Sequence, residues 1–144
     1  MKLLFAFALI FLGATMPVLA EKKIIQPKEF APGGPFNPAV LVDGTLYVSG
    51  QIGRDLKTQK IPDDFDAEVK QVLENIGVIL REAKMNYVDV VAVQVYLTDM
   101  DQFQKMNAIY TTYFKENRPS RTTVGVAKLA APNAHIEITV TARH

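Results

Sequence analysis

Arg121 and Glu137 are the two charged side chains of this sequence that are best placed to do chemistry. Arg121 begins one predicted strand, and Glu137 stands between Ile136 and Ile138 in the last predicted strand, which we expect to be adjacent. Because successive residues of a strand point to opposite faces, Glu137 faces away from its two apolar neighbours. If another subunit covers that face, the carboxylate needs a partner or a wet cleft. From the strand pattern alone, a solvent-exposed carboxylate and a surface arginine remain the simpler interpretation.

The composition excludes several kinds of site. The chain has 144 residues, one domain's length, and no cysteine, which rules out disulfides, Cys-based zinc sites, iron–sulfur clusters and a thiol nucleophile. His135 and His144 are its only histidines, too few for a multi-histidine metal site within one chain. With 16 Lys and Arg against 15 Asp and Glu, it lacks the basic excess of a dedicated nucleic-acid or membrane-surface binder. It contains no GxSxG, P-loop, GxGxxG or HExxH motif, so the mechanisms that use them have no support.

The first twenty residues have the pattern of a secretory signal peptide. Lys2 supplies a positive charge, Leu3–Leu12 is an unbroken apolar run, and Val18-Leu19-Ala20 ends the segment as a cleavage site does. The apolar run is shorter than the ~20 residues that a membrane-spanning helix needs. We therefore expect export, cleavage after Ala20 and a domain at residues 21–144, in the periplasm or secreted, with no membrane contact afterwards. An uncleaved anchoring helix is the alternative.

The rest of the chain divides into short strands and two amphipathic helices. The predicted strands are Lys23–Ile25, Val40–Val42, Thr45–Ser49, Val88–Thr98, Thr122–Lys128 and His135–Ala142. Apolar residues at spacings of three and four mark helices over Asp66–Lys84 and Met100–Lys115. The order is therefore β-β-β-α-β-α-β-β. The 49% apolar and 22% charged residues suit a folded globular domain.

Patterns within the strands predict how the sheet is arranged. Asp43-Gly44 between two strands is a strong hairpin signal, because a type I′ turn needs positive φ at both central residues. The strand Val88–Thr98 has apolar residues on both faces, with Val91 on the same face as Val93, so we expect it to be central. Two helices can cover one face of such a six-stranded sheet, which predicts an α+β domain. The other face carries apolar and β-branched side chains, which favours an oligomer.

Six blocks of the sequence occur in an order typical of one family. They are Pro32-Gly33-Gly34-Pro35-Phe36, Leu46-Tyr47-Val48-Ser49-Gly50-Gln51-Ile52, Val95-Tyr96-Leu97-Thr98-Asp99-Met100, Met106-Asn107-Ala108-Ile109-Tyr110, Pro119-Ser120-Arg121-Thr122-Thr123-Val124-Gly125-Val126-Ala127 and Ile136-Glu137-Ile138. In these blocks the chain resembles the reactive-intermediate deaminase family (Rid, or YjgF) of enamine/imine deaminases. The resemblance covers essentially all of the chain after residue 20, and six blocks in register are highly specific.

The resemblance implies a fold, an assembly and a reaction. The fold is a chorismate-mutase-like α+β fold with two helices on one face of a six-stranded mixed sheet. The assembly is a homotrimer whose sheets form a central barrel, with the sites in clefts between subunits. The reaction is hydrolysis of 2-imino acids, which arise from enamines such as 2-aminoacrylate, to 2-keto acids and ammonia. Because an imine carbon is already electrophilic, positioning could suffice without a metal or cofactor.

The same resemblance suggests roles for individual residues. Arg121 matches the arginine that binds the substrate carboxylate, for which a planar bidentate guanidinium is better suited than lysine. Glu137 matches the glutamate associated with the attacking water, where a carboxylate could orient the water or move a proton. The residues expected to line the substrate cleft are Ser49, Gly50 and Gln51 at a strand end and Asn107 on the second helix.

Two residues depart from the family pattern. Phe36 stands where many of these deaminases have tyrosine, so a hydroxyl that could contact substrate or water is absent. Thr123 stands where several members have cysteine, which keeps a small polar group but loses the thiol. Both positions are expected to touch the substrate. Export is a third departure, since the familiar sources of aminoacrylate are cytoplasmic enzymes.

Two other functions compete with the deaminase. One is a trimeric protein that binds small carboxylates through Arg121 without turning them over. The other is an endoribonuclease or translation inhibitor, activities attributed to some relatives of this family. Balanced charge, an export signal and the lack of a histidine pair for acid–base RNA cleavage weigh against it, so we expect no nucleic-acid partner. The expected partners are a small 2-imino acid and further copies of the chain.

Overall fold

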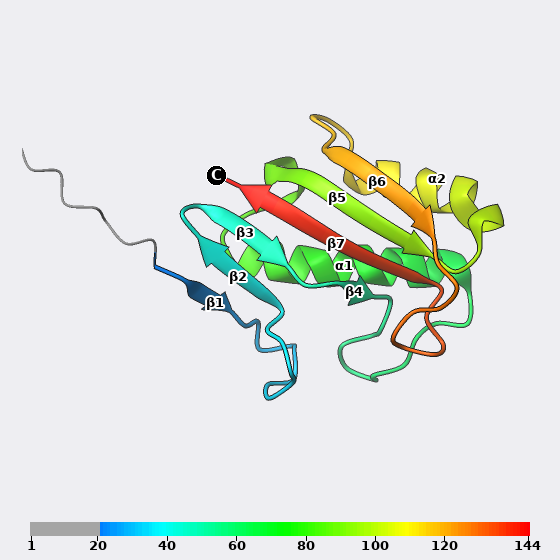
Figure 1. The fold of residues 1–144 in the computed structure, drawn as a ribbon, viewed down its shortest axis with the longest axis horizontal. Coiled ribbons are helices and arrows are strands. Elements are labelled where there is room, and N and C mark those ends of the chain that lie inside the picture. The colour runs from blue at the N-terminus through cyan, green and yellow to red at the C-terminus, as the bar shows by residue number, and fades with distance from the viewer. Residues whose placement is uncertain (1–20) are drawn as a thin grey trace, which may run out of the picture.

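The chain after residue 20 forms a mixed sheet with two long helices (Figure 1). The computed structural model describes residues 21–144, so the expected signal peptide at 1–20 lies outside the described residues. The strands are β1 (Lys23–Ile25), β2 (Ala39–Val42), β3 (Thr45–Val48), β4 (Gln51–Ile52), β5 (Val90–Leu97), β6 (Ser120–Gly125) and β7 (Ile136–Arg143). The helices are α1 (Phe65–Glu82) and α2 (Phe103–Tyr113), and 3-10 turns at Tyr87–Asp89 and Met100–Gln102 precede β5 and α2. None of the helices in the described part is both long and apolar enough to span a bilayer.

The sheet has the order β1-β2-β3-β7-β5-β6, with β4 paired to β7 beside β3. The β5–β6 pair is parallel and the other pairs are antiparallel, which confirms the predicted α+β class with a mixed sheet. The sheet has seven strands instead of the expected six, because the predicted strand Thr45–Ser49 is followed by a second short strand. The ladder is interrupted at Ser49, whose N–H donates to the Pro38 carbonyl (3.0 Å), and pairing resumes at Gln51.

The positions of two strands differ from the expectation. We predicted that the strand carrying Arg121 lies next to the one carrying Glu137, and this is wrong because β5 lies between β6 and β7. The chain leaves β5, crosses over through α2 and returns as β6, parallel to β5 at the outer edge of the sheet. A connection of that kind places the returning strand beside the one it left. Arg121 and Glu137 are therefore two strands apart.

The hydrophobic core lies between the sheet and the helices. From α1 it takes the predicted residues Val69, Val72, Leu73, Ile76, Ile79 and Leu80, with Ala83 at the helix end, and from β7 it takes Ile136, Ile138, Val140 and Ala142. The turn between β2 and β3 is also as predicted, since Asp43 (φ 48°) and Gly44 (φ 71°) both have positive φ. Local patterns were sufficient to predict these features, because the period of a helix or a strand decides which face each residue occupies.

A β-bulge changes one face assignment in β5. The register shifts between Val90 and Ala92, so that Val90 is buried with Val93 while Val91 is 49% exposed. The prediction that Val91 shares a face with Val93 is therefore wrong. A bulge adds one residue to a strand and so reverses the alternation on one side of it.

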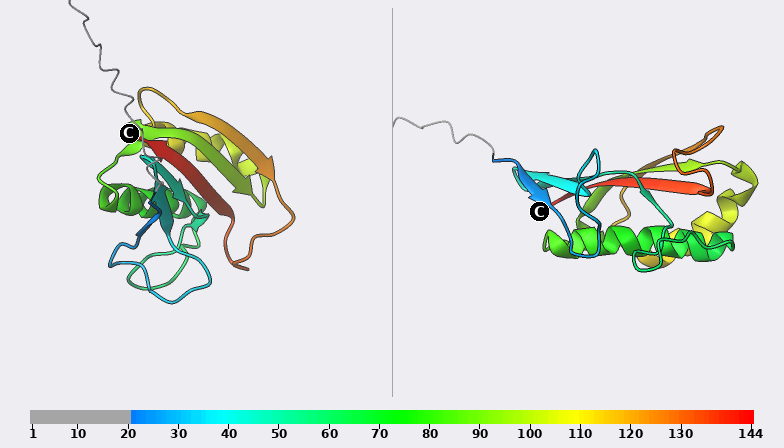
Figure 2. Two further views of the ribbon diagram at one scale, coloured as in Figure 1. Left: turned by 60° about the vertical axis from the view of Figure 1, so that its left-hand side comes forward. Right: turned by 90° about the horizontal axis from the view of Figure 1, so that it is seen from below.

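The sheet face opposite the helices is uncovered in this chain. The right-hand view of Figure 2 shows both helices on the same side of the sheet. Ile24, Val40, Tyr47 and Thr141 are successive cross-strand partners on the open face. Ile24 is 51% exposed and Tyr47 is 54% exposed. The open face thus carries large apolar side chains, as the sequence predicted.

Candidate active site

Arg121 projects from the helix-covered face of the sheet. It pairs with Val93 across the β5–β6 ladder, and Thr123 pairs with Val95. Val93 and Val95 are buried beneath the helices, and directly paired residues point to the same face of a sheet. Arg121 and Thr123 therefore both point toward α2, at the outer edge of the sheet.

The guanidinium of Arg121 is held by α2. Its Nη2 donates a hydrogen bond to Asn107 Oδ1 (2.8 Å), and its central carbon lies 4.5 Å from the centroid of the Tyr110 ring. A cation this close to an aromatic ring is attracted by the ring's quadrupole, so the stack fixes the plane of the guanidinium. A guanidinium has five N–H donors. Among residues 21–144 only Asn107 accepts a side-chain hydrogen bond from Arg121, which leaves donors for an anionic ligand.

Two buried hydroxyls beside Arg121 have no hydrogen-bond partner among residues 21–144, those of Thr123 and Tyr110. Buried polar atoms are nearly always paired, so each of these hydroxyls still has a hydrogen bond to give to a water or a ligand that reaches this edge. Burial raises the pKa of Tyr110 above its usual value, and Arg121 and Arg118 partly offset this effect. The Tyr110 hydroxyl is therefore protonated at neutral pH and can donate. Tyr110 is not among the predicted site residues; its three-residue spacing from Asn107 is the signal in the sequence that the two residues share a face of α2.

Glu137 lies on the open face and packs against Gly50. It pairs with Ile52 of β4 on one side and with Tyr96 of β5 on the other. A Cβ at Gly50 would overlap the Glu137 carboxylate, so a larger residue at position 50 would displace that carboxylate. Glu137 is half-buried, and no side-chain hydrogen bond or ion pair holds its carboxylate within the described chain. It is available to bind a water or a proton.

The predicted cleft residues Ser49 and Gln51 are tied to the backbone around Gly50. Ser49 Oγ donates to the Asn37 carbonyl (2.7 Å), and Gln51 Nε2 donates to the Ser49 carbonyl (2.9 Å). These bonds hold the interruption between β3 and β4 in shape. Phe36 lies nearby in the preceding loop with 66% of its surface exposed. Phe36, Gly50 and Gln51 all line one cavity of about 350 Å³.

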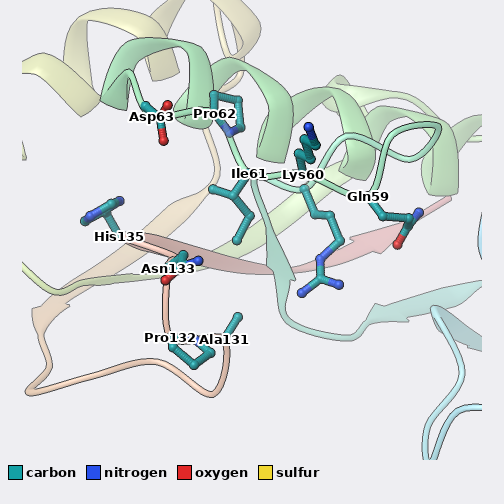
Figure 3. Close-up of a pocket in the computed structure, with 10 residues that line it drawn as sticks. Gln59, Lys60, Ile61, Pro62, Asp63, Ala131, Pro132, Asn133 and His135 are labelled. Carbon is teal, nitrogen blue, oxygen red and sulfur yellow. The ribbon is translucent and has the colours of Figure 1, made fainter.

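A larger cavity of about 620 Å³ lies elsewhere and contains none of the predicted site residues. It is lined by the loop 59–63, which leads into α1, and by residues 131–135, which lead into β7 (Figure 3). The residues lining both cavities include Arg54 and Gln59. Within residues 21–144, no group of three or more acidic or histidine side chains could hold a metal ion.

A family model described as endoribonuclease L-PSP matches residues 26–144, nearly the whole of this domain. The chain belongs to the endoribonuclease L-PSP family. Its relatives include the 2-iminobutanoate/2-iminopropanoate deaminase of Rattus norvegicus, which is 43% identical over 115 residues (79% of this chain and 84% of the rat protein). Among solved structures, the YjgF gene product of E. coli has a TM-score of 0.78 and 33% identity, covering 85% of this chain and 98% of its own. E. coli TdcF with bound serine has a TM-score of 0.78 and 31% identity over the same shares. The family that the six motif blocks indicate is therefore confirmed.

In this member of the L-PSP family, the predicted site residues form two groups. The arginine group consists of Arg121, Asn107 and Thr123, to which the structure adds Tyr110. The glutamate group consists of Glu137, Ser49, Gly50, Gln51 and Phe36. The Arg121 and Glu137 side chains point to opposite faces of the sheet, so one chain does not bring these two side chains around a common substrate. Gln51 pairs with the buried Ile138 and therefore points toward the helices.

Proposed function

We propose that this chain hydrolyses 2-imino acids, formed from 2-enamine acids such as 2-aminoacrylate, to 2-keto acids and ammonia. The observation that carries the proposal is the stacked, singly hydrogen-bonded guanidinium of Arg121 beside two unpaired hydroxyls. A planar guanidinium that still has N–H groups available to donate is complementary to a carboxylate. Two relatives support this chemistry by their names, the rat imine deaminase and the TdcF structure with bound serine, itself a small carboxylate.

Arg121 binds and orients the carboxylate of the imino acid in this proposal. Asn107 and the Tyr110 ring fix the guanidinium, so little side-chain entropy is lost when the substrate binds. The hydroxyls of Thr123 and Tyr110 are further donors at the same edge. With its carboxylate held, the substrate presents its imine carbon in one direction, which is the entropic part of catalysis.

Glu137 is the general base that activates the attacking water. Its carboxylate accepts a proton from the water that adds to the C=N carbon, and a C–O bond forms while the nitrogen takes up the electron pair of the C=N bond. Glu137 passes this proton to the nitrogen, which gives a neutral carbinolamine. Glu137 then accepts the carbinolamine's hydroxyl proton and delivers it to the nitrogen as the C–N bond breaks, so that ammonia leaves and the 2-keto acid remains. The electrophile is in the substrate, so none of these steps needs a cofactor.

The arginine group of one copy meets the glutamate group of another when copies of the chain associate as a homotrimer. The α2–β6 edge carries the arginine group, and the interruption between β3 and β4 carries the glutamate group. A contact between two different surfaces of the same chain is head-to-tail, and such contacts close into a ring of three when each copy is rotated by 120° from the last. Three copies with the apolar open faces turned inward give three equivalent sites, and the side chains exposed on that face, Ile24 and Tyr47 among them, become buried.

Export completes the proposal. A signal peptide at residues 1–20 would deliver a domain of residues 21–144 to the periplasm or the medium, where the deaminase would meet imino acids outside the cytoplasm. N-terminal sequencing of the protein recovered from a cell fractionation tests this part. A chain retained in the cytoplasm with its first residues intact would refute it.

The experiment that tests the activity measures ammonia and keto-acid release from freshly generated 2-iminopropionate. Wild type is compared with Arg121→Ala, and with Arg143→Ala as a matched arginine variant on an exposed strand end. We expect release by wild type and Arg143→Ala and little release by Arg121→Ala. Binding of 2-ketobutyrate without any release by wild type would instead identify a non-catalytic carboxylate-binding protein.

The family's description makes RNA cleavage the second candidate. The same purified preparations are therefore incubated with single-stranded RNA. Cleavage that survives further purification and is lost in Arg121→Ala would establish a nuclease. Cleavage that disappears on further purification would remove this candidate.

A further inference from the structure

Glu68 is a fully buried carboxylate outside both groups of site residues. It lies in the first turn of α1, and its side chain has 0% exposure. Removing a carboxylate from water is unfavourable unless hydrogen bonds replace its hydration. A buried acid of this kind needs an explanation, because an apolar side chain would fill the same space at lower cost.

All three recorded partners of Glu68 are at the start of β7. Its Oε1 accepts from the backbone N–H groups of His135 (2.8 Å) and Ile136 (3.3 Å). Its Oε2 lies 2.8 Å from Nδ1 of the His135 ring, which is 53% exposed. The carboxylate thus clamps the two residues that directly precede Glu137.

The same helix also holds the strand on the other side of Glu137. Asn75 Nδ2 donates to the carbonyls of Ile52 (3.1 Å) and Arg54 (2.8 Å) at the end of β4. A Cβ at Gly53 would overlap Glu68, so β4 also packs directly on this side chain. Ile52 of β4 is the strand partner of Glu137. Helix α1 therefore fixes both β7, which carries Glu137, and β4, which directly follows Gly50.

We propose that Glu68 is a positioning residue for Glu137, and this inference rests on the proposed function. Glu68 sets the depth and register of the first residues of β7, and thereby holds the Glu137 carboxylate over Gly50 at the distance that water attack requires. It does not touch the substrate. Loss of the clamp displaces Glu137 while leaving the arginine group in place, because Asn107 and Tyr110 of α2 hold Arg121 and none of the hydrogen bonds of Glu68 goes to that group.

The test compares Glu68→Ala, Glu68→Gln and Ile79→Ala. Glutamine keeps an oxygen for the two backbone N–H groups, and its amide can donate to Nδ1 of His135. Ile79 is fully buried in the same helix and lies about 16 Å further along its axis than Glu68, so Ile79→Ala is a matched control that loosens the core away from Glu68. We expect Glu68→Ala to lower kcat about 10- to 100-fold with little change in KM, as a small misplacement of a catalytic group does. Glu68→Gln should retain most of kcat, and Ile79→Ala should keep turnover per folded trimer.

Amide hydrogen exchange keeps this inference separable from the proposed function. Glu68→Ala should accelerate exchange at residues 135–137 selectively, whereas Ile79→Ala should not. Unchanged protection at residues 135–137, or a kcat for Glu68→Ala equal to that of Ile79→Ala at a temperature where both are folded, overturns the positioning role. Absence of imine hydrolysis by wild type overturns the proposed function instead, and the exchange result then still decides whether Glu68 positions Glu137.

Discussion

The Arg121 guanidinium and the Glu137 carboxylate lie on opposite faces of one sheet, two strands apart. The register shows this directly. Arg121 pairs with the buried Val93 of β5, and Glu137 pairs with Tyr96 of β5. Val93 and Tyr96 are three residues apart in one strand, so they point to opposite faces. A substrate that bridges a carboxylate-binding group and a water-activating group therefore needs the arginine of one copy and the glutamate of another.

Arg121→Lys tests the carboxylate clamp. Lysine keeps the positive charge but loses the planar fork and the stack on Tyr110. We expect a loss of roughly 1.5–3 kcal/mol in substrate binding, seen as a KM increase of about 10- to 100-fold. Steady-state kinetics on 2-iminopropionate measure it, with Arg143→Lys as the control. An unchanged kcat/KM would end the carboxylate-clamp interpretation and most of the case for an imino-acid substrate.

Glu137→Gln tests proton transfer. Glutamine has the same size and much of the same hydrogen bonding but cannot take a proton. We expect kcat to fall by about 10²-fold or more with a smaller effect on KM. Melting temperatures are measured beside the kinetics, and Glu116→Gln, at an exposed position, is the control. A lower melting temperature with normal turnover per folded trimer would mean that Glu137 only satisfies polar neighbours.

The sequence was sufficient for the parts of this fold that depend on neighbouring residues. The burial of Ile136 and Ile138 with Glu137 on the other face follows from strict alternation, and the Asp43-Gly44 turn follows from its backbone conformation. The bulge at Val91 could not be predicted, because nothing in an apolar run shows where a strand gains a residue. The place of β6 beyond β5 also depends on how α2 crosses over, which local patterns do not contain.

The candidate site was predicted by residue type and not by geometry. Arg121 and Asn107 contact each other as expected of residues in one cleft. Tyr110 was missed as a site residue because an aromatic at helical spacing is typical of a core. Glu68 carries no signal in the sequence, since an acidic residue is common in the first turn of a helix and a glutamate is usually at the surface.

Phe36→Tyr tests whether a missing hydroxyl limits catalysis. The Phe36 ring is 66% exposed in the single chain, so an added hydroxyl would not clash with neighbouring side chains there. We expect kcat to rise or to stay unchanged while the fold is retained, measured by kinetics and circular dichroism. A large loss of activity would show that an apolar pocket of another copy encloses the ring, and that its assigned role is wrong.

Gly77→Ala tests the packing that positions α1. Alanine normally stabilises a helix interior by up to ~1 kcal/mol relative to glycine. Here its Cβ would overlap the Tyr87 hydroxyl, which donates to the Leu73 carbonyl (2.7 Å). We expect Gly77→Ala to destabilise by about 1–3 kcal/mol in urea unfolding. The same change in a Tyr87→Phe background should be neutral or stabilising. A stabilising effect of Gly77→Ala alone would contradict this packing.

The oligomeric state of the wild type and of two variants tests the proposed trimer. Sedimentation of residues 21–144 should give three times the mass of one chain. It should do so for Arg121→Ala and Glu137→Gln as well, because neither side chain belongs to the hydrophobic part of the open face. A stable monomer at micromolar concentration would refute both the trimer and a site between subunits.

The most direct test mixes those two variants. Arg121→Ala and Glu137→Gln, each inactive alone, are unfolded together in equal amounts and refolded. If every site takes its arginine from one copy and its glutamate from the next, random trimers regain about one quarter of the wild-type sites. We expect imine hydrolysis at about that fraction of the wild-type rate. No activity above that of the separate variants, in mixed trimers of the correct mass, would contradict it.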